Sequence, residues 1–167
     1  MAANVVPSPL LGKLKTANLG FPRMGRQREL KFALEGFWAG KRAEEDLLDV
    51  AARLRADHWR LQKSTGLDIV PSNDFSLYDH VLDALVLVGA TPERFGSGTV
   101  TLERYFAMAR NSREQTAMEM TKWFDTNYHY LVPEWSEGIA FKVDTTKLLA
   151  EIREARARSE ERRVERV

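Results

Sequence analysis

Four cations follow a short apolar stretch near the start of the chain, in the segment NLGFPRMGRQRELK. Arg23, Arg26, Arg28 and Lys31 lie within nine positions, and Glu29 is the only acid among them. Arg28 and Lys31 are three positions apart, so they share one face of a helix. Their side chains, together with the backbone N–H groups of a first helical turn, suit a ligand with several carboxylates or phosphates. The spacing predicts a polyanion site, and the competing interpretation is a turn whose cations face water.

Lys122 is a second candidate binding residue, far from the first four in the sequence. It lies in MTKWF, near the end of a predicted strand and next to aromatic residues. A lysine among apolar side chains must be paired or must reach a polar opening, because an unpaired buried ammonium group is costly. Lys122 is therefore a stronger candidate than an average surface lysine.

Other familiar site patterns are missing from the sequence. The segment Gly-Phe-Pro-Arg-Met-Gly fits neither G-x-x-x-x-G-K-[ST] nor G-x-G-x-x-G, which argues against nucleotide binding. His58 lies on an apolar helical stripe and is expected to be a core histidine, and neither His80 nor His129 has a second histidine at H-E-x-x-H spacing. Ser76, His80 and Asp83 lack a G-x-S-x-G nucleophile turn. We predict neither a zinc site nor a hydrolase triad within this chain.

The elements that position these residues follow from hydrophobic periodicity and from turn residues. Short apolar runs predict strands at 17–21, 67–71 and 120–124, with a further short strand at 141–143. Helical spacing and helix stop signals predict helices at 28–39, 44–65, 75–89 and 101–110, and one from about residue 145. The aromatic segment 127–135 is expected to be irregular.

Strands that alternate with helices predict an α/β fold with a parallel sheet. A chain of 167 residues is too short for a complete (β/α)8 barrel of roughly 250 residues. The chain is therefore either a small open α/β domain or the opening portion of a larger one. In such folds ligands gather at the carboxyl ends of the strands, where the cation segment is expected to lie.

Composition limits the possible partners. A net charge of +1 argues against general nucleic-acid binding, and no apolar run approaches the roughly 20 residues that span a bilayer. The absence of cysteine excludes disulfides and thiolate chemistry within the chain and fits a reducing compartment such as the cytoplasm. We expect a flexible leader at 1–15, one domain at 16–150 and a charged helical or frayed tail at 151–167. A transit peptide is the alternative for the leader, because the first 28 residues carry five cations and no acid.

Three segments, taken together, resemble one family. NLGFPRMGRQRELK, GLDIVPSNDFSLYDHVLD and EMTKWFDTNYHYLVPE are similar, in this order and spacing, to the N-terminal part of cobalamin-independent methionine synthase. That enzyme is the 5-methyltetrahydropteroyltriglutamate–homocysteine methyltransferase. The resemblance covers about 16–149 and implies an incomplete (β/α)8 TIM-type barrel, with the first three or so βα units of the N-terminal barrel.

The resemblance also implies a role for the cations. The family's Arg-Glu-Leu-Lys motif corresponds to Arg28, Glu29, Leu30 and Lys31, and its strand lysine corresponds to Lys122. These positions are implied to contact the methyl-donating folate with its triglutamate tail. Several carboxylates on one tail would explain why arginine and lysine are crowded here, since both form charge-assisted hydrogen bonds to carboxylates.

One departure from the family concerns the reaction itself. The resemblance implies a zinc ion that activates homocysteine, held by histidine and cysteine near the far end of the full-length enzyme, and this chain has no cysteine. We therefore expect no methyl transfer from this chain alone, and we expect the remainder of the two-barrel protein as its partner. Two alternatives stay open: a stand-alone module that binds a polyanion or a partner chain, and a different small α/β enzyme that uses Asp/His chemistry.

Overall fold

A computed structural model describes residues 14–112 and 115–164. Within these ranges the chain forms five α-helices, one short 3-10 helix and one two-stranded sheet, which confirms a mixed α/β fold. The elements are α1 (Glu29–Trp38), α2 (Glu44–Ser64), α3 (His80–Val88), η2 (Glu93–Phe95), α4 (Leu102–Ala109), β1 (Met120–Lys122), β2 (His129–Leu131) and α5 (Thr146–Val164). The expected leader lies outside the described residues except for 14 and 15, and α5 continues without a break across residue 150.

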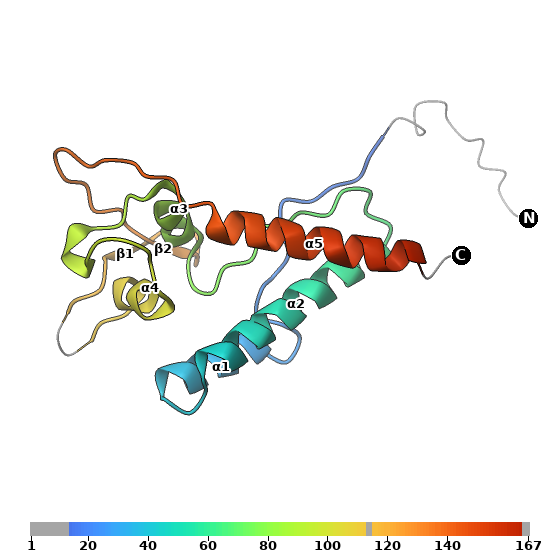
Figure 1. Cartoon of the computed structure of the whole chain (residues 1–167), viewed down its shortest axis with the longest axis horizontal. Helices are drawn as coiled ribbons and strands as arrows, with labels where there is room; N and C mark the ends of the chain where they lie inside the picture. Colours follow the sequence, from blue (N-terminus) through green and yellow to red (C-terminus); the bar gives the residue numbers. More distant parts are fainter. Residues whose placement is uncertain (1–13, 113–114, 165–167) are drawn as a thin grey trace, which may run out of the picture.

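Figure 1 shows two groups of elements joined by α5. Helix α1 packs against α2, while α3 and α4 lie with the β1–β2 hairpin, and α5 runs from the second group across α2. One apolar core extends through both groups. Its fully buried members include Leu30 of α1, Leu47 of α2, Leu82 of α3 and Leu131 of β2. Each such leucine stabilises the fold by about 1.5–3 kcal/mol relative to an exposed one.

The predicted helix at 75–89 begins later than expected. Helix α3 starts at His80, because the carboxylate of Asp79 accepts a hydrogen bond from the backbone N–H of Leu82 at 2.9 Å and caps the first turn. The residues just before Asp79 form an irregular turn whose carbonyls face Arg23. Periodicity alone did not reveal this turn, because its apolar residues continue the helical stripe.

Among the described residues, the predicted parallel sheet is limited to one pairing, and the third predicted strand does not join it. Ala17 and Ile69 form one isolated parallel bridge, and β1 pairs with β2 in an antiparallel hairpin instead of joining the earlier segments. A short turn returns the chain directly after β1, and the backbone N–H of Trp123 donates to the carbonyl of Tyr128 across it at 2.8 Å. Strand β2 therefore lies within 127–135, where we expected irregular structure.

Residues 141–143 also do not form the expected strand. Their backbone bonds run to the end of α3: Lys142 donates to the carbonyl of Val88 at 3.0 Å, and Asp144 donates to Leu87 at 2.8 Å. The segment therefore satisfies the last carbonyls of a helix rather than extending a sheet.

Large apolar side chains remain exposed at each of the three main predicted strands. The exposed fractions are 101% for Leu19, 52% for Ile69 and 44% for Met120. In the part of the chain that the structure describes, no helix combines the length and the apolar character needed to cross a membrane.

Candidate functional site

The backbone of Arg28 is held in an unusual conformation at the start of α1. Arg28 precedes the helix with φ 62° and ψ 35°, in the left-handed region that residues with a Cβ rarely occupy. Its own N–H donates to the carbonyl of Gly25 at 3.4 Å, and the N–H of Leu30 donates to Met24 at 3.2 Å. The Arg28 side chain is exposed and makes no hydrogen bond or ion pair with any described residue, so it is available to a ligand.

The two middle residues of the Arg-Glu-Leu-Lys motif hold the turn together. Leu30 is fully buried in the core, so only its backbone can face a ligand. The carboxylate of Glu29 accepts a hydrogen bond from the N–H of Gln27 at 3.0 Å. Gly25 (φ 82°) lies so close to this carboxylate that an added Cβ would clash with it, which explains the glycine there.

Lys31 lies one helical turn from Arg28 and is also exposed. Its Nζ atom is 3.7 Å from a carboxylate oxygen of Glu35, in an i,i+4 pair with both side chains about half exposed. Exposed pairs of this kind contribute only about 0–1 kcal/mol, so Lys31 can exchange this partner for a ligand carboxylate at little cost.

Lys122 ends β1 and faces His129 of β2 across the hairpin. The hydrogen bond from Trp123 to Tyr128 makes 123–128 a hydrogen-bonded pair, so Lys122 and His129 form the neighbouring non-hydrogen-bonded pair, in which side chains are closest. Both side chains are exposed, and Nδ1 of His129 lies 3.0 Å from the carbonyl of Asn127. In the sequence, His129 was a candidate metal ligand only, because no local signal marks it as a neighbour of Lys122.

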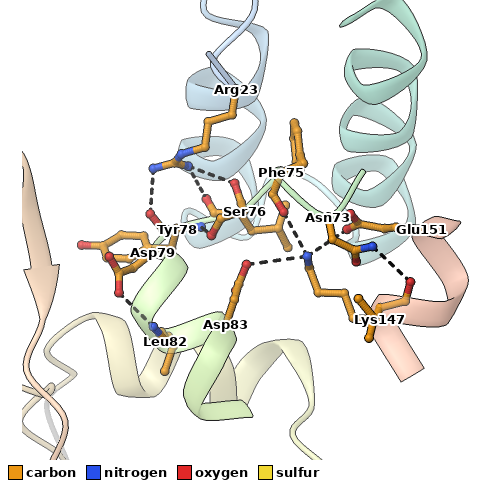
Figure 2. Close-up of polar contacts among 12 residues, drawn as sticks. Arg23, Asn73, Phe75, Ser76, Tyr78, Asp79, Leu82, Asp83, Lys147 and Glu151 are labelled. Carbon is orange, nitrogen blue, oxygen red and sulfur yellow. Dashed lines mark hydrogen bonds and ion pairs between the residues drawn. The ribbon is translucent and has the colours of Figure 1, made fainter. Parts of the chain in front are cut away.

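Arg28 and Lys31 thus lie three positions apart at the start of α1, and Lys122 lies on a different element, β1. None of the hydrogen bonds or ion pairs between described residues joins Lys122 directly to α1. Arg23 links the segment before α1 to the turn before α3. Its guanidinium donates to the carbonyls of Ser76, Leu77 and Tyr78 at 3.2, 2.8 and 2.7 Å, so this cation of the first segment is held by protein (Figure 2).

A second polar cluster lies where α5 meets α3 (Figure 2). The ammonium group of Lys147 lies 2.9 Å from Glu151, 3.6 Å from Asp83 and 3.0 Å from the carbonyl of Phe75. Burial raises the pKa of Glu151, and the charge of Lys147 opposes this shift. Burial, together with the neighbouring Asp83, also raises the pKa of Tyr105, whose hydroxyl donates to Asp83 at 2.7 Å. The cluster joins helices and leaves few free polar atoms for a ligand.

Histidine and carboxylate side chains do not form a metal site in the described ranges, where no three potential ligands come together. The imidazole of His58 packs on the ring of Phe21, with centroids 4.7 Å apart, and burial lowers its pKa. His58 therefore packs against an aromatic ring at a half-buried position beside the core and not within it. The side chains of these ranges therefore do not fit the zinc site of histidine and cysteine that the family resemblance implies.

Comparison with known proteins gives one consistent answer. Residues 15–165 match the family described as "Cobalamin-independent synthase, N-terminal domain", well past residue 149 where the resemblance drawn from motifs ends. A 5-methyltetrahydropteroyltriglutamate–homocysteine methyltransferase of Salinibacter ruber is 54% identical over 152 residues, with 84% of this chain and 20% of the relative covered. Proteins of the same name from Chelativorans sp. and Rhodopseudomonas palustris are 50% and 52% identical, with 87% and 86% of this chain covered.

The chain spans about a fifth of the length of these relatives, since it covers 20–21% of each. Both the family match and the identities extend over most of the chain. The chain therefore belongs to the cobalamin-independent methionine synthase family, and it corresponds to part of that family's N-terminal domain.

Proposed function

We propose that this chain supplies the folate-tail-binding part of a methyltransferase that moves a methyl group from 5-methyltetrahydropteroyltri-L-glutamate to L-homocysteine. The relatives' names provide the substrates. The observation that carries the proposal is the start of α1, where two exposed cations lie three positions apart. Arg28 has no partner among the described residues, and Lys31 has only the exposed Glu35.

Each residue of the proposed site has a separate task. Arg28 and Lys31 bind glutamyl carboxylates, Glu29 and the buried Leu30 fix the turn that presents them, and Lys122 adds a cation from the hairpin. Exposed ion pairs contribute about 0–1 kcal/mol each, so affinity depends on several pairs acting on one tail. The binding should therefore weaken as ionic strength rises.

Methyl transfer itself is not assigned to this chain. The family resemblance implies zinc, but the residues present do not fit it, so the metal and the binding of homocysteine are proposed to belong to the remainder of the protein. A location in the cytoplasm is part of the same proposal and is supported by the absence of cysteine.

We also propose that the fold is the first three or so βα units of an incomplete (β/α)8 barrel. Two features support this reading. The bridge between Ala17 and Ile69 is parallel, as neighbouring barrel strands are, and Leu19, Ile69 and Met120 expose apolar side chains that further strands would cover.

Titration of the 167-residue chain with triglutamyl and monoglutamyl folate tests the function. We expect tighter binding of the triglutamyl form and a loss of affinity of up to about fivefold for Arg28→Ala, because one exposed charge-assisted contact is removed. Arg26→Ala is the matched control, since Arg26 is also exposed but lies outside the motif. In the complete enzyme, Arg28→Ala should raise KM for the triglutamyl donor. Equal affinity for both folates would contradict the proposal and favour a module with another polyanion or a partner chain.

A further inference from the structure

Arg23 joins the segment before α1 to the turn before α3. Its half-buried guanidinium satisfies three consecutive carbonyls, those of Ser76, Leu77 and Tyr78. A planar fork with five N–H donors can serve several acceptors at once, whereas a lysine ammonium cannot copy this geometry. Arg23 therefore fixes the position of this turn relative to the chain that leads into Arg28.

Asp79 directly follows that turn and is bonded to both α3 and β2. Its side chain is buried, with 4% of the residue exposed. One oxygen accepts from the N–H of Leu82 at 2.9 Å and of Leu131 at 3.4 Å, and the other accepts from the hydroxyl of Tyr128 at 3.5 Å. A buried carboxylate is tolerated only when such donors surround it.

The two donors from the hairpin lie on either side of His129. Tyr128 precedes His129, and Leu131 ends β2 two residues later. His129 is the cross-strand partner of Lys122, so Asp79 holds β2 on both sides of the residue that faces Lys122. Burial and the neighbouring Asp79 raise the pKa of Tyr128, and the charge of Arg23 opposes this shift. The charges of both Asp79 and Arg23 therefore act on the Tyr128 hydroxyl.

We infer that Arg23 and Asp79 are positioning residues, which hold the hairpin carrying Lys122 in a fixed place relative to the turn carrying Arg28. This inference rests on the proposed function, because two cations on separate elements can bind one glutamyl tail only if their separation is fixed. Neither positioning residue touches the ligand. Arg23 acts through the turn before α3, and Asp79 acts through β2.

The test uses Arg23→Lys and Tyr128→Phe in the 167-residue chain. Tyr128→Phe removes only the hydroxyl that Asp79 accepts from, and the fold should persist. Tyr130→Phe is the matched control, because its hydroxyl lies in the same hairpin and forms no hydrogen bond with any described residue. Two quantities are measured: the affinity for triglutamyl folate with and without Lys122→Ala, and amide hydrogen exchange of β1 in the free protein.

We expect triglutamyl affinity to fall about threefold in Arg23→Lys and about twofold in Tyr128→Phe, and to stay constant in Tyr130→Phe. In the Lys122→Ala background these losses should shrink, because a positioning effect that acts through Lys122 disappears with it. Amide exchange of Thr121 and Lys122 should become faster in both variants. A simple loss of stability would instead lower affinity equally in both backgrounds.

The outcomes separate this inference from the proposed function. If the unsubstituted chain prefers triglutamyl folate but both variants bind it unchanged, the proposed function stands and the positioning role is overturned. If the unsubstituted chain shows no preference, the proposed function fails and the positioning role fails with it. Unchanged exchange of β1 in Arg23→Lys would also overturn the positioning role, whatever the affinity.

Discussion

Lys122 and His129 face each other across the β1–β2 hairpin, as a non-hydrogen-bonded pair with both side chains exposed. A charge at position 129 therefore acts directly on Lys122, because opposite residues in such pairs are in close contact. His129→Glu should pair with Lys122 and weaken triglutamyl-folate binding about two- to fivefold, the ratio that about 0.5–1 kcal/mol gives.

Thr121→Glu is the control for this substitution. It adds the same charge to the same hairpin, on the strand that carries Lys122. Successive side chains of a strand point to opposite faces, so the new carboxylate points away from Lys122. Isothermal titration of both variants measures the difference. Equal losses of affinity would show that net charge, and not the pairing of Lys122 with residue 129, determines binding.

Arg28→Gly should stabilise the fold while it weakens ligand binding. Arg28 has φ 62°, a conformation that costs a residue with a Cβ roughly 1 kcal/mol and costs glycine little. The free energy of unfolding should rise by roughly 0.5–1 kcal/mol, as measured by urea denaturation. Arg26→Gly provides the contrast, since Arg26 lacks a positive φ. The free energy of unfolding of this variant should fall or stay unchanged. A less stable Arg28→Gly variant would mean that the arginine side chain itself supports the turn.

Glu151 should make stability depend on pH. Its pKa is raised by burial above the ordinary 4.5, so the folded chain holds its proton at pH values where the unfolded chain has lost it. The free energy of unfolding should therefore fall as pH rises from about 4.5 through the raised pKa. Glu151→Gln should remove this fall.

Urea denaturation at several pH values between 4.5 and 7 provides the measurement. Glu154→Gln is the control, because Glu154 lies one turn further along α5 and pairs with Arg55 at 2.8 Å. The expected result is a flatter pH profile for Glu151→Gln than for either the unsubstituted chain or the control. An identical slope in all three proteins would exclude Glu151 as its source.

Exposed apolar residues should cause self-association. Leu19 and Ile69 are 101% and 52% exposed and lie in segments that the parallel bridge brings together. We expect the 167-residue chain to associate as its concentration rises and the double variant Leu19→Lys, Ile69→Lys to stay monomeric with a similar melting temperature. Sedimentation velocity at several concentrations gives the result. A monodisperse unsubstituted monomer with one cooperative melting transition would contradict both this expectation and the incomplete barrel.

The sequence predicted the helices well where local signals are strong. Helix α2 begins at Glu44, where three acids open the helix, and it ends before Gly66, as the stop signal indicates. Helix α1 lies within the range predicted from periodicity, directly after Arg28. These features depend on neighbours a few positions apart, so the local sequence is sufficient to fix them.

The candidate site was predictable only in part. The cation motif and Lys122 were found from residue type and from the family resemblance. Arg23 was grouped with the binding cations, but its guanidinium is bonded to a turn that lies 53–55 residues away in the sequence. The contact of Asp79 with the hairpin was not predicted, because its bond to Leu131 spans 52 residues.

By itself, the sequence determined the boundaries of α1 and α2, the cation-rich start of α1 and membership of the family, since each is encoded in residue order and local spacing. Only the tertiary structure decided that β1 pairs with β2, that Lys122 faces His129 and that Asp79 holds both α3 and β2. Strand pairing and the partners of buried polar groups are selected by contacts between distant segments. A local pattern has the same appearance whichever distant partner the folded chain provides.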